Sequence, residues 1–183
     1  ACLDVFLFIT KPMNIDESFL YEIKPGSSIS VLSRNLHSKE ILSRPYYLSI
    51  YARLIGQAGK LKVGEYKIES GMTPHQLLMT IVSGKVKQYS ITLVEGYTFW
   101  QTMALINDSP FLSNNLANLS DSEIMAKLGY PNQHQEGRFS PDNYHFPKGM
   151  SDIYFLHRAY DQRQQHINAG WQDRDISQQF KTT

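Results

Sequence analysis

The chain has 183 residues, of which 42% are hydrophobic and 12% aromatic, and its formal net charge is +1. That length and apolar content suffice for a buried core in one large domain or two small ones, which excludes wholesale disorder. A balanced charge provides no basic stripe, so we expect no nucleic-acid partner. The lone cysteine, Cys2, excludes an intramolecular disulfide and fits either the cytoplasm or an exported protein without disulfides.

The N-terminal residues 1–9 are apolar except for Asp4. The run is too short to cross a bilayer, which takes about 20 residues, and no basic segment precedes it as in a signal peptide. Two interpretations remain open: the stub of a longer membrane anchor, or a first strand buried in the core. Residues 10–18 are polar and indicate a linker.

Residues 19–68 predict a compact strand-helix-helix-strand unit whose two strands can pair. Ser28 is a good N-cap for the first helix. Ser43 and Pro45 open the second helix, and Gly56 closes it. The four elements are expected over residues 19–23, 29–37, 45–55 and 65–68.

Further cap residues and apolar stripes predict more helices downstream, with caps at Thr73, Thr98 and Ser120. The last helix begins at residues 150–152 and is expected to end before Gly170. A strand is expected at residues 89–93, where apolar and polar residues alternate. The Asn- and Ser-rich residues 107–120 predict an irregular segment.

Residues 135–144 crowd two carboxylates, an arginine and two aromatics into one short stretch. Gly137 permits a tight turn, and Pro141 lacks the N–H that a central strand needs. The stretch therefore predicts an ordered loop, a common place for binding residues. Its candidates are Glu136, Arg138, Asp142 and Tyr144. The alternative is a surface turn closed by a hydrogen bond of Asp142 to its own backbone.

No metal or cofactor site can be singled out from residue spacing. No two histidines stand four residues apart, and neither a phosphate-binding glycine pattern nor a serine-hydrolase motif is present. The carboxylates Glu95, Glu136 and Asp142 remain. Glycan cleavage needs a carboxylic acid with a raised pKa. Glu95 has an alternative role as a capping or dipole partner of the helix that follows Thr98.

Several short motifs follow one another in a characteristic order. They are Ile23-Lys24-Pro25-Gly26-Ser27, Val63-Gly64-Glu65-Tyr66, Gly71-Met72-Thr73, Ser83-Gly84-Lys85, Leu93-Val94-Glu95-Gly96 and Glu136-Gly137-Arg138-Phe139-Ser140-Pro141-Asp142-Asn143-Tyr144. Because these motifs occur in this order and at this spacing, the chain resembles the YceG-like family of endolytic murein transglycosylases over about residues 19–175. Asn143 departs from the threonine that is usual in the family, but it keeps a small polar side chain.

The resemblance implies an α+β fold and three regions. Residues 1–18 would be a membrane-anchor stub and linker, residues 19–70 a LysM-like module, and residues 71–183 the N-terminal part of an incomplete catalytic domain. Family members look like single-pass proteins of the bacterial inner membrane with the body in the periplasm. They cleave peptidoglycan glycan strands without water, need no cofactor, and leave 1,6-anhydro-muramic ends.

The resemblance supplies no catalytic residue for this chain. The family's catalytic glutamate lies on an Ile-Glu-Lys-Glu-like segment downstream of the Trp171 region, and no such segment occurs before Thr183. We therefore expect a truncated chain that is inactive alone. Substrate contacts or cleft-shaping roles are expected for Glu95, Glu136, Arg138, Asp142, Tyr144 and Tyr66. For Tyr66, burial in the core of the small module is an equal alternative to a place in a glycan-facing groove.

Two other functions remain open at this stage. The chain could be a non-catalytic module that binds glycan, or a structural domain that holds other cell-wall synthesis proteins.

Overall fold

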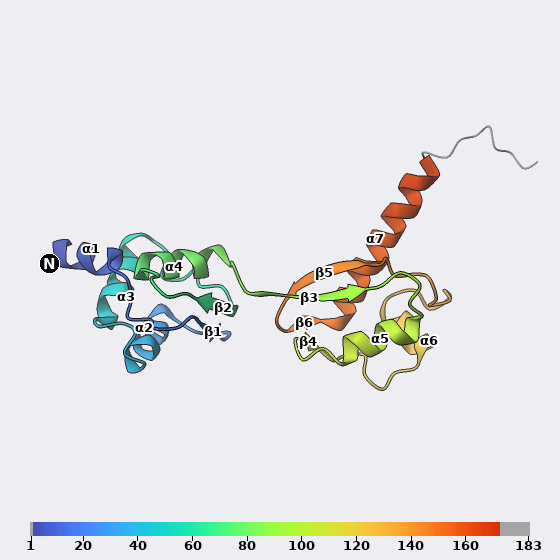
Figure 1. The fold of residues 1–183 in the computed structure, drawn as a ribbon, viewed down its shortest axis with the longest axis horizontal. Coiled ribbons are helices and arrows are strands. Elements are labelled where there is room, and N and C mark those ends of the chain that lie inside the picture. The colour runs from blue at the N-terminus through green and yellow to red at the C-terminus, as the bar shows by residue number, and fades with distance from the viewer. Residues whose placement is uncertain (1, 173–183) are drawn as a thin grey trace, which may run out of the picture. The chain divides into compact units, whose positions relative to one another are not determined.

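A computed structural model describes residues 2–172 (Figure 1). Its contacts divide the chain into two compact units, Ala1–Gln88 and Tyr89–Thr183. Helices and strands are mixed in both, as expected for an α+β fold. We describe each unit by itself.

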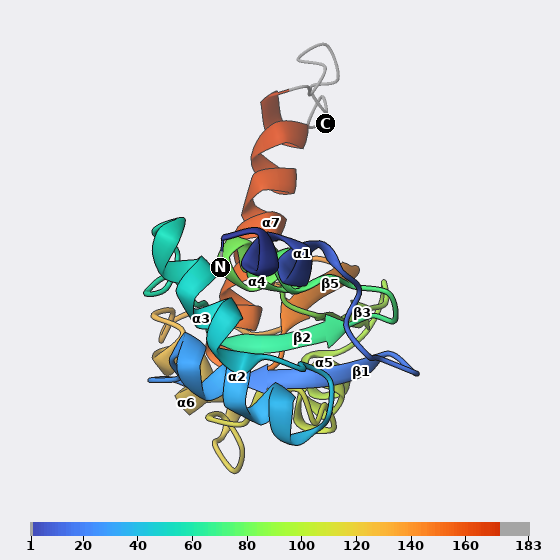
Figure 2. The ribbon, with the colours of Figure 1, turned by 90° about the vertical axis from the view of Figure 1, so that its left-hand side faces the viewer.

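The first unit surrounds one antiparallel strand pair. Its elements are α1 (Cys2–Thr10), β1 (Phe19–Ile23), α2 (Ile29–Ser38), α3 (Pro45–Leu54), β2 (Gly64–Ile68) and α4 (Pro74–Ser83). β1 and β2 run side by side, with Tyr21 opposite Tyr66 (Figure 2). The predicted strand-helix-helix-strand order is therefore present. α4 also belongs to this unit, although the sequence analysis places the start of the second region at residue 71.

Side-chain caps begin two helices of the first unit as predicted. Ser28 accepts a hydrogen bond from the N–H of Val31 at the start of α2. Thr73 and Gln76 form a capping box at the start of α4. α3 differs, because its N-cap is Arg44 and no side chain caps it. There the fixed φ of Pro45 in the first turn favours the helix without a cap.

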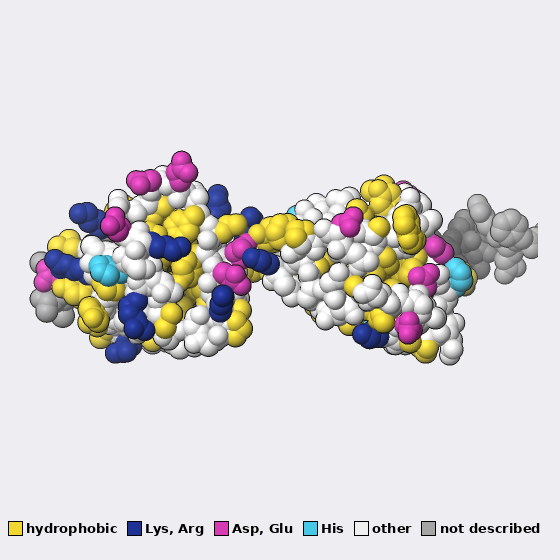
Figure 3. Space-filling model, turned by 90° about the horizontal axis from the view of Figure 1, so that it is seen from below, with side chains coloured by type: hydrophobic (Ala, Val, Ile, Leu, Met, Phe, Trp, Pro, Cys, Tyr) yellow, Lys and Arg dark blue, Asp and Glu magenta, His cyan; other side chains and the backbone are white. Residues whose placement is uncertain are grey.

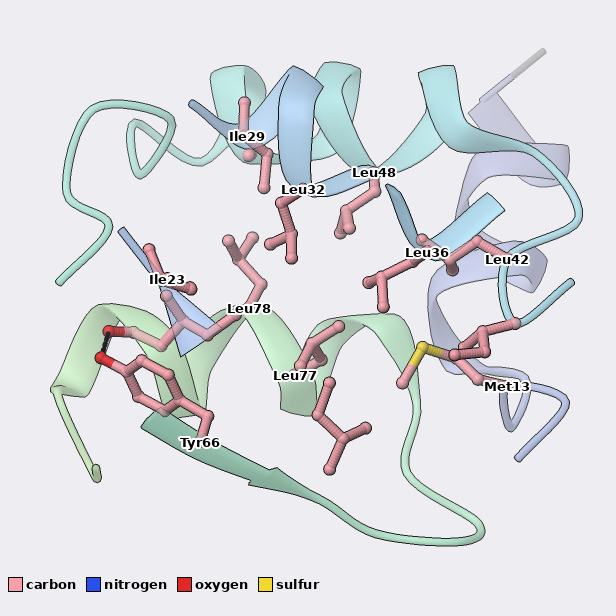
Figure 4. Close-up of a cluster of buried hydrophobic side chains, with 14 of the residues drawn as sticks. Met13, Ile23, Ile29, Leu32, Leu36, Leu42, Leu48, Tyr66, Leu77 and Leu78 are labelled. Atoms are coloured by element: carbon pink, nitrogen blue, oxygen red, sulfur yellow. Dashed lines mark hydrogen bonds between the residues drawn. The ribbon is translucent and has the colours of Figure 1, made fainter. Parts of the chain in front are cut away.

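Aliphatic side chains from both strands and from α2, α3 and α4 meet in the core of the first unit (Figure 4). Several of these side chains are completely buried. They are Leu36, Leu48, Ile68, Leu78 and Ile81. This core holds the strand pair rigidly against the helices.

The N-terminal segment is a helix and not a strand, which corrects one of the two interpretations of residues 1–9. In α1, Ile9 is buried, and the ring of Phe8 meets that of Tyr47 edge-on at 5.6 Å. Phe6 and Leu7, on the other hand, are 60% and 57% exposed. Across residues 2–172, no helix combines the length and the apolar character needed to cross a membrane.

The expected linker after α1 is irregular but packed. Met13 and Ile15 are buried in the first core. The N–H of Met13 donates to the carbonyl of Met72 at 2.9 Å, and the Ser70 hydroxyl donates to the carbonyl of Ile15 at 2.8 Å. These bonds tie residues 10–18 to the segment before α4.

The second unit combines short strands with three helices among its described residues. Its elements are β3 (Gln88–Leu93), α5 (Phe99–Asn107), β4 (Leu112–Ser113), α6 (Asp121–Lys127), β5 (Asp142–Pro147), β6 (Met150–Ser151) and α7 (Asp152–Gln172). β3 pairs with β5, and β4 pairs with β6 in parallel. Capping boxes begin α5 at Thr98 and α6 at Ser120, as predicted.

Three predictions about the second unit need correction. The expected loop 135–144 ends in the strand β5, since Pro141 precedes the strand and removes no N–H from it. The expected irregular segment 107–120 contains β4, whose two residues pair only with the distant β6. Finally, α7 continues past Gly170, because one glycine in a helix costs only about 1 kcal/mol.

Candidate functional site

The segment that precedes β5 is held against the start of α5. Glu136 Oε2 accepts a hydrogen bond at 3.0 Å from the N–H of Phe99, the first residue of α5. That N–H has no partner within the helix, and a negative charge is favoured at this end of a helix dipole. Glu136 therefore fills the role that the sequence analysis considered for Glu95.

Aromatic stacking and backbone bonds fix the same segment to α7. The ring of Phe139 stacks on Phe99 at 5.6 Å and meets Tyr160 of α7 at 6.5 Å. The N–H of Ser140 donates to the carbonyl of Ala159 at 3.0 Å. The loop is thus ordered, and it joins α5 to α7.

Asp142 begins β5 and is exposed. One carboxylate oxygen accepts a hydrogen bond from the side chain of Gln162 on α7, and the other accepts the N–H of Asn143. These two bonds, that of Gln162 first, lower the pKa of Asp142. A general acid for glycan cleavage needs a raised pKa, so Asp142 is suited to accept hydrogen bonds and not to donate a proton.

The side chains of the other two candidates in this segment donate hydrogen bonds to backbone carbonyls of this chain. Tyr144 is buried, and its hydroxyl donates to the carbonyl of Ser140 at 2.8 Å. Burial raises the pKa of this phenol to about 12. Arg138 is half-buried, and its Nε donates to the carbonyl of His134 at 3.1 Å. Both side chains hold the loop in shape.

Glu95 lies at the turn between β3 and α5 and is exposed. The same short stretch carries two exposed aromatics, Tyr97 at 39% and Trp100 at 75%. Glu95 is among the residues predicted from the sequence, whereas Tyr97 and Trp100 are not. The start of α5 therefore brings together Glu95, Glu136 through its bond to the helix, and two exposed aromatic rings.

Tyr66 lies in the first unit and not with the other candidates. Its side chain is 1% exposed and lies in the core (Figure 4). Its hydroxyl shares its one hydrogen between the carbonyls of Lys62 at 2.8 Å and Ile81 at 3.2 Å. Burial raises the pKa of its phenol. Tyr66 is thus a core residue, and the alternative of a groove-lining side chain is wrong.

Asp152 is a buried carboxylate at the predicted start of the last helix, and it is not among the predicted site residues. It is 0% exposed at the start of α7. One oxygen accepts the N–H groups of Asn115 at 2.7 Å and Leu116 at 2.8 Å, and the other accepts the N–H of Ile153 at 2.8 Å. The donors Asn115 and Leu116 lie 37 and 36 positions away in the sequence, so no local pattern could have revealed them. The role of Asp152 is structural, because donors of this chain surround it.

The described residues contain no group of three or more His, Cys, Asp or Glu side chains placed to hold a metal ion. Chemically, the second unit offers carboxylates, amides and aromatic rings near the start of α5. This set suits the binding of a polar, uncharged ligand better than proton transfer.

The YceG-like family profile matches residues 21–183. The match spans most of the chain, and the chain belongs to the YceG-like family. Among solved structures, a crystal structure of a yceG-like protein from Listeria monocytogenes is similar, at 24% identity and a TM-score of 0.41. The similarity covers 85% of this chain but only 57% of that one. No curated protein matches the chain.

Proposed function

We propose that the chain is part of an endolytic murein transglycosylase that acts in bacterial cell-wall assembly. In this role it binds peptidoglycan glycan strands, and its second unit forms one wall of a cleft. The observation that carries the proposal is the family match over residues 21–183, and the placement of residues 135–144 between α5 and α7 supports it. A wall of a cleft must keep its shape while the glycan is bound.

The catalytic glutamate is not assigned to residues 1–183. Each carboxylate in the 135–144 segment accepts hydrogen bonds from this chain, and the lowered pKa of Asp142 is the reverse of what the acid step requires. Cleavage without water would give 1,6-anhydro-muramic ends, with one glutamate acting as acid and then as base. That glutamate would come from a segment outside residues 1–183.

The first unit is proposed to be a LysM-like module that contacts the glycan. In support, β1, α2, α3 and β2 follow one another in the order expected of such a module, with the outer strands paired. The location in the inner membrane with the body in the periplasm is a further part of the proposal. It is supported by α1, an apolar helix with Phe6 and Leu7 exposed.

Two assays test the proposal with the purified 1–183 chain. In a pull-down, the chain should sediment with purified sacculi, and competing soluble glycan should release it. In a digestion of the same sacculi, no anhydro-muropeptides should appear. Failure to sediment contradicts glycan binding, and release of anhydro-ends contradicts the assignment of the catalytic residue.

A second candidate is a module that binds glycan or a cell-wall synthesis protein without any cleavage in the whole protein. The hydrogen bonds that Glu136 and Asp142 accept from other groups of this chain favour it. The discriminating observation is the sacculus digestion repeated with the entire native open reading frame. Absence of anhydro-ends there would favour this candidate.

A further inference from the structure

Among the described residues of the second unit, Trp100 is the most exposed aromatic side chain, at 75%. It lies in the first turn of α5, and Ala104 follows one turn later on the same face of the helix. A groove next to Trp100 runs between α5 and the start of α6. Trp100 stands at its edge, Met103, Leu116 and Ile124 line its floor, and Asn107 and Asn118 lie on its rim.

The floor of this groove is apolar and rigid. Met103, Leu116 and Ile124 belong to the core of the second unit and are 7%, 1% and 3% exposed. Leu116 is fixed further by the bond of its N–H to the buried Asp152. The floor therefore keeps its shape without a ligand, which lowers the ordering cost of binding.

The rim of the groove is polar. Asn107, Asp108 and Asn118 are exposed, and within the described part of the chain no hydrogen bond occupies their side chains. Asn118 has a φ of +64°, a left-handed conformation that asparagine tolerates. Asp121 is positioned by a hydrogen bond from Gln135 at 2.9 Å. The rim thus offers amide and carboxylate groups to a ligand.

The charge of the groove restricts the class of ligand. No lysine or arginine lines it. Residues 89–183 contain seven Lys and Arg against ten Asp and Glu, a net charge of −3. Figure 3 shows acidic side chains among hydrophobic ones on the face of the second unit that it presents. Phosphates and nucleic acids are therefore repelled.

We infer that this groove binds a neutral sugar ring, with the ring stacked on Trp100 and its hydroxyl groups bonded to Asn107, Asp108 and Asn118. A pyranose has an apolar face of C–H groups and a rim of hydroxyls, and an exposed indole beside amides and a carboxylate complements both. The inference deepens the proposed function and rests on it, because it assigns a glycan-binding subsite to the second unit.

Intrinsic fluorescence tests the inference directly, since the chain has two tryptophans, Trp100 and Trp171. The Trp171→Phe variant leaves Trp100 as the single reporter, and Trp100→Phe is the matched control. Titration with the neutral hexamer of N-acetylglucosamine should change the emission of Trp171→Phe saturably and leave that of Trp100→Phe unchanged. Inorganic phosphate should change neither. A flat titration of Trp171→Phe, or a response to phosphate, overturns the inference.

The polar rim is tested in the Trp171→Phe background. Asn107→Ala and Asn118→Gly each remove an amide, and glycine keeps the left-handed backbone at residue 118. Each should weaken binding about tenfold, which equals about 1.4 kcal/mol. Asn114→Ala, outside the groove, should leave the affinity unchanged. Equal affinities for all three variants overturn the assignment of the rim.

Running the sacculus pull-down in parallel separates the two proposals. Sedimentation of the chain without a hexamer response contradicts the groove alone. A saturable hexamer response without sedimentation contradicts the proposed function and leaves the groove as a sugar site.

Discussion

The carboxylate of Glu136 accepts a hydrogen bond at 3.0 Å from the backbone N–H of Phe99, although 37 positions separate the two residues in the sequence. The ring of Phe99 also stacks on that of Phe139. The loop therefore contacts Phe99 twice. It bonds to the backbone of Phe99 and packs against its side chain. This double contact sets the position of residues 135–144, on which the proposed cleft depends.

Replacement of Glu136 by alanine should destabilise the second unit. The N–H of Phe99 loses its acceptor, and the loss of such a bond at a helix start typically costs about 0.5–2 kcal/mol. Glu136→Gln keeps an oxygen acceptor and should cost less. The measurement is the free energy of unfolding in urea. Glu95→Ala is the exposed control on the other side of the turn, and an equal loss for Glu95→Ala and Glu136→Ala would contradict this role.

Replacement of Asp152 by alanine should be among the most damaging single changes. It leaves the buried N–H groups of Asn115 and Leu116 without an acceptor, at about 1–3 kcal/mol for each donor. The measurement is again urea unfolding, and we expect the free energy of unfolding to fall by about 2 kcal/mol or more. Asp161→Asn, an exposed change on the same helix, should be nearly neutral. A stable, fully folded Asp152→Ala protein would show that the carboxylate is dispensable.

Tyr66 should tolerate loss of its hydroxyl better than loss of its ring. Tyr66→Phe keeps the buried ring and gives up the hydrogen bond that the hydroxyl shares between two carbonyls, which we expect to cost about 1–2 kcal/mol. Tyr66→Ser also empties the core and should cost about 3–5 kcal/mol, as other large-to-small core changes do. Thermal unfolding ranks the variants. Loss of sacculus binding by a folded Tyr66→Phe protein would instead indicate a direct contact with glycan.

Acid should remove the contribution of Asp142 to stability. Its folded-state pKa is lowered from 3.8 by the bonds from Gln162 and Asn143. The stabilisation is therefore complete above about pH 4 and is lost as the pH falls through the lower, folded-state value. The difference in unfolding free energy between the wild type and Asp142→Asn should shrink in that range. Gln162→Ala should reduce this pH dependence. If the difference in unfolding free energy between the wild type and Asp142→Asn does not change with pH, the prediction is wrong.

Local sequence determined most helix starts and strands of this protein. Ser28, Thr73, Thr98 and Ser120 cap helices as predicted, because a cap bond spans only three residues and is encoded within that window. The strands β1 and β3 also follow directly from alternating residues. The family resemblance is likewise visible in the sequence, and the family match over residues 21–183 confirms it.

The tertiary structure decided what the individual side chains do. Tyr66 belongs to the core because α4 supplies the carbonyl of Ile81, a partner that no local pattern reveals. Glu136 and Asp152 bond to N–H groups about 37 residues away in the sequence. The two-residue strand β4 exists only through its pairing with β6. Bonds and packing between distant residues depend on how the chain folds back on itself, so residue type and spacing alone could nominate these side chains but could not assign their roles.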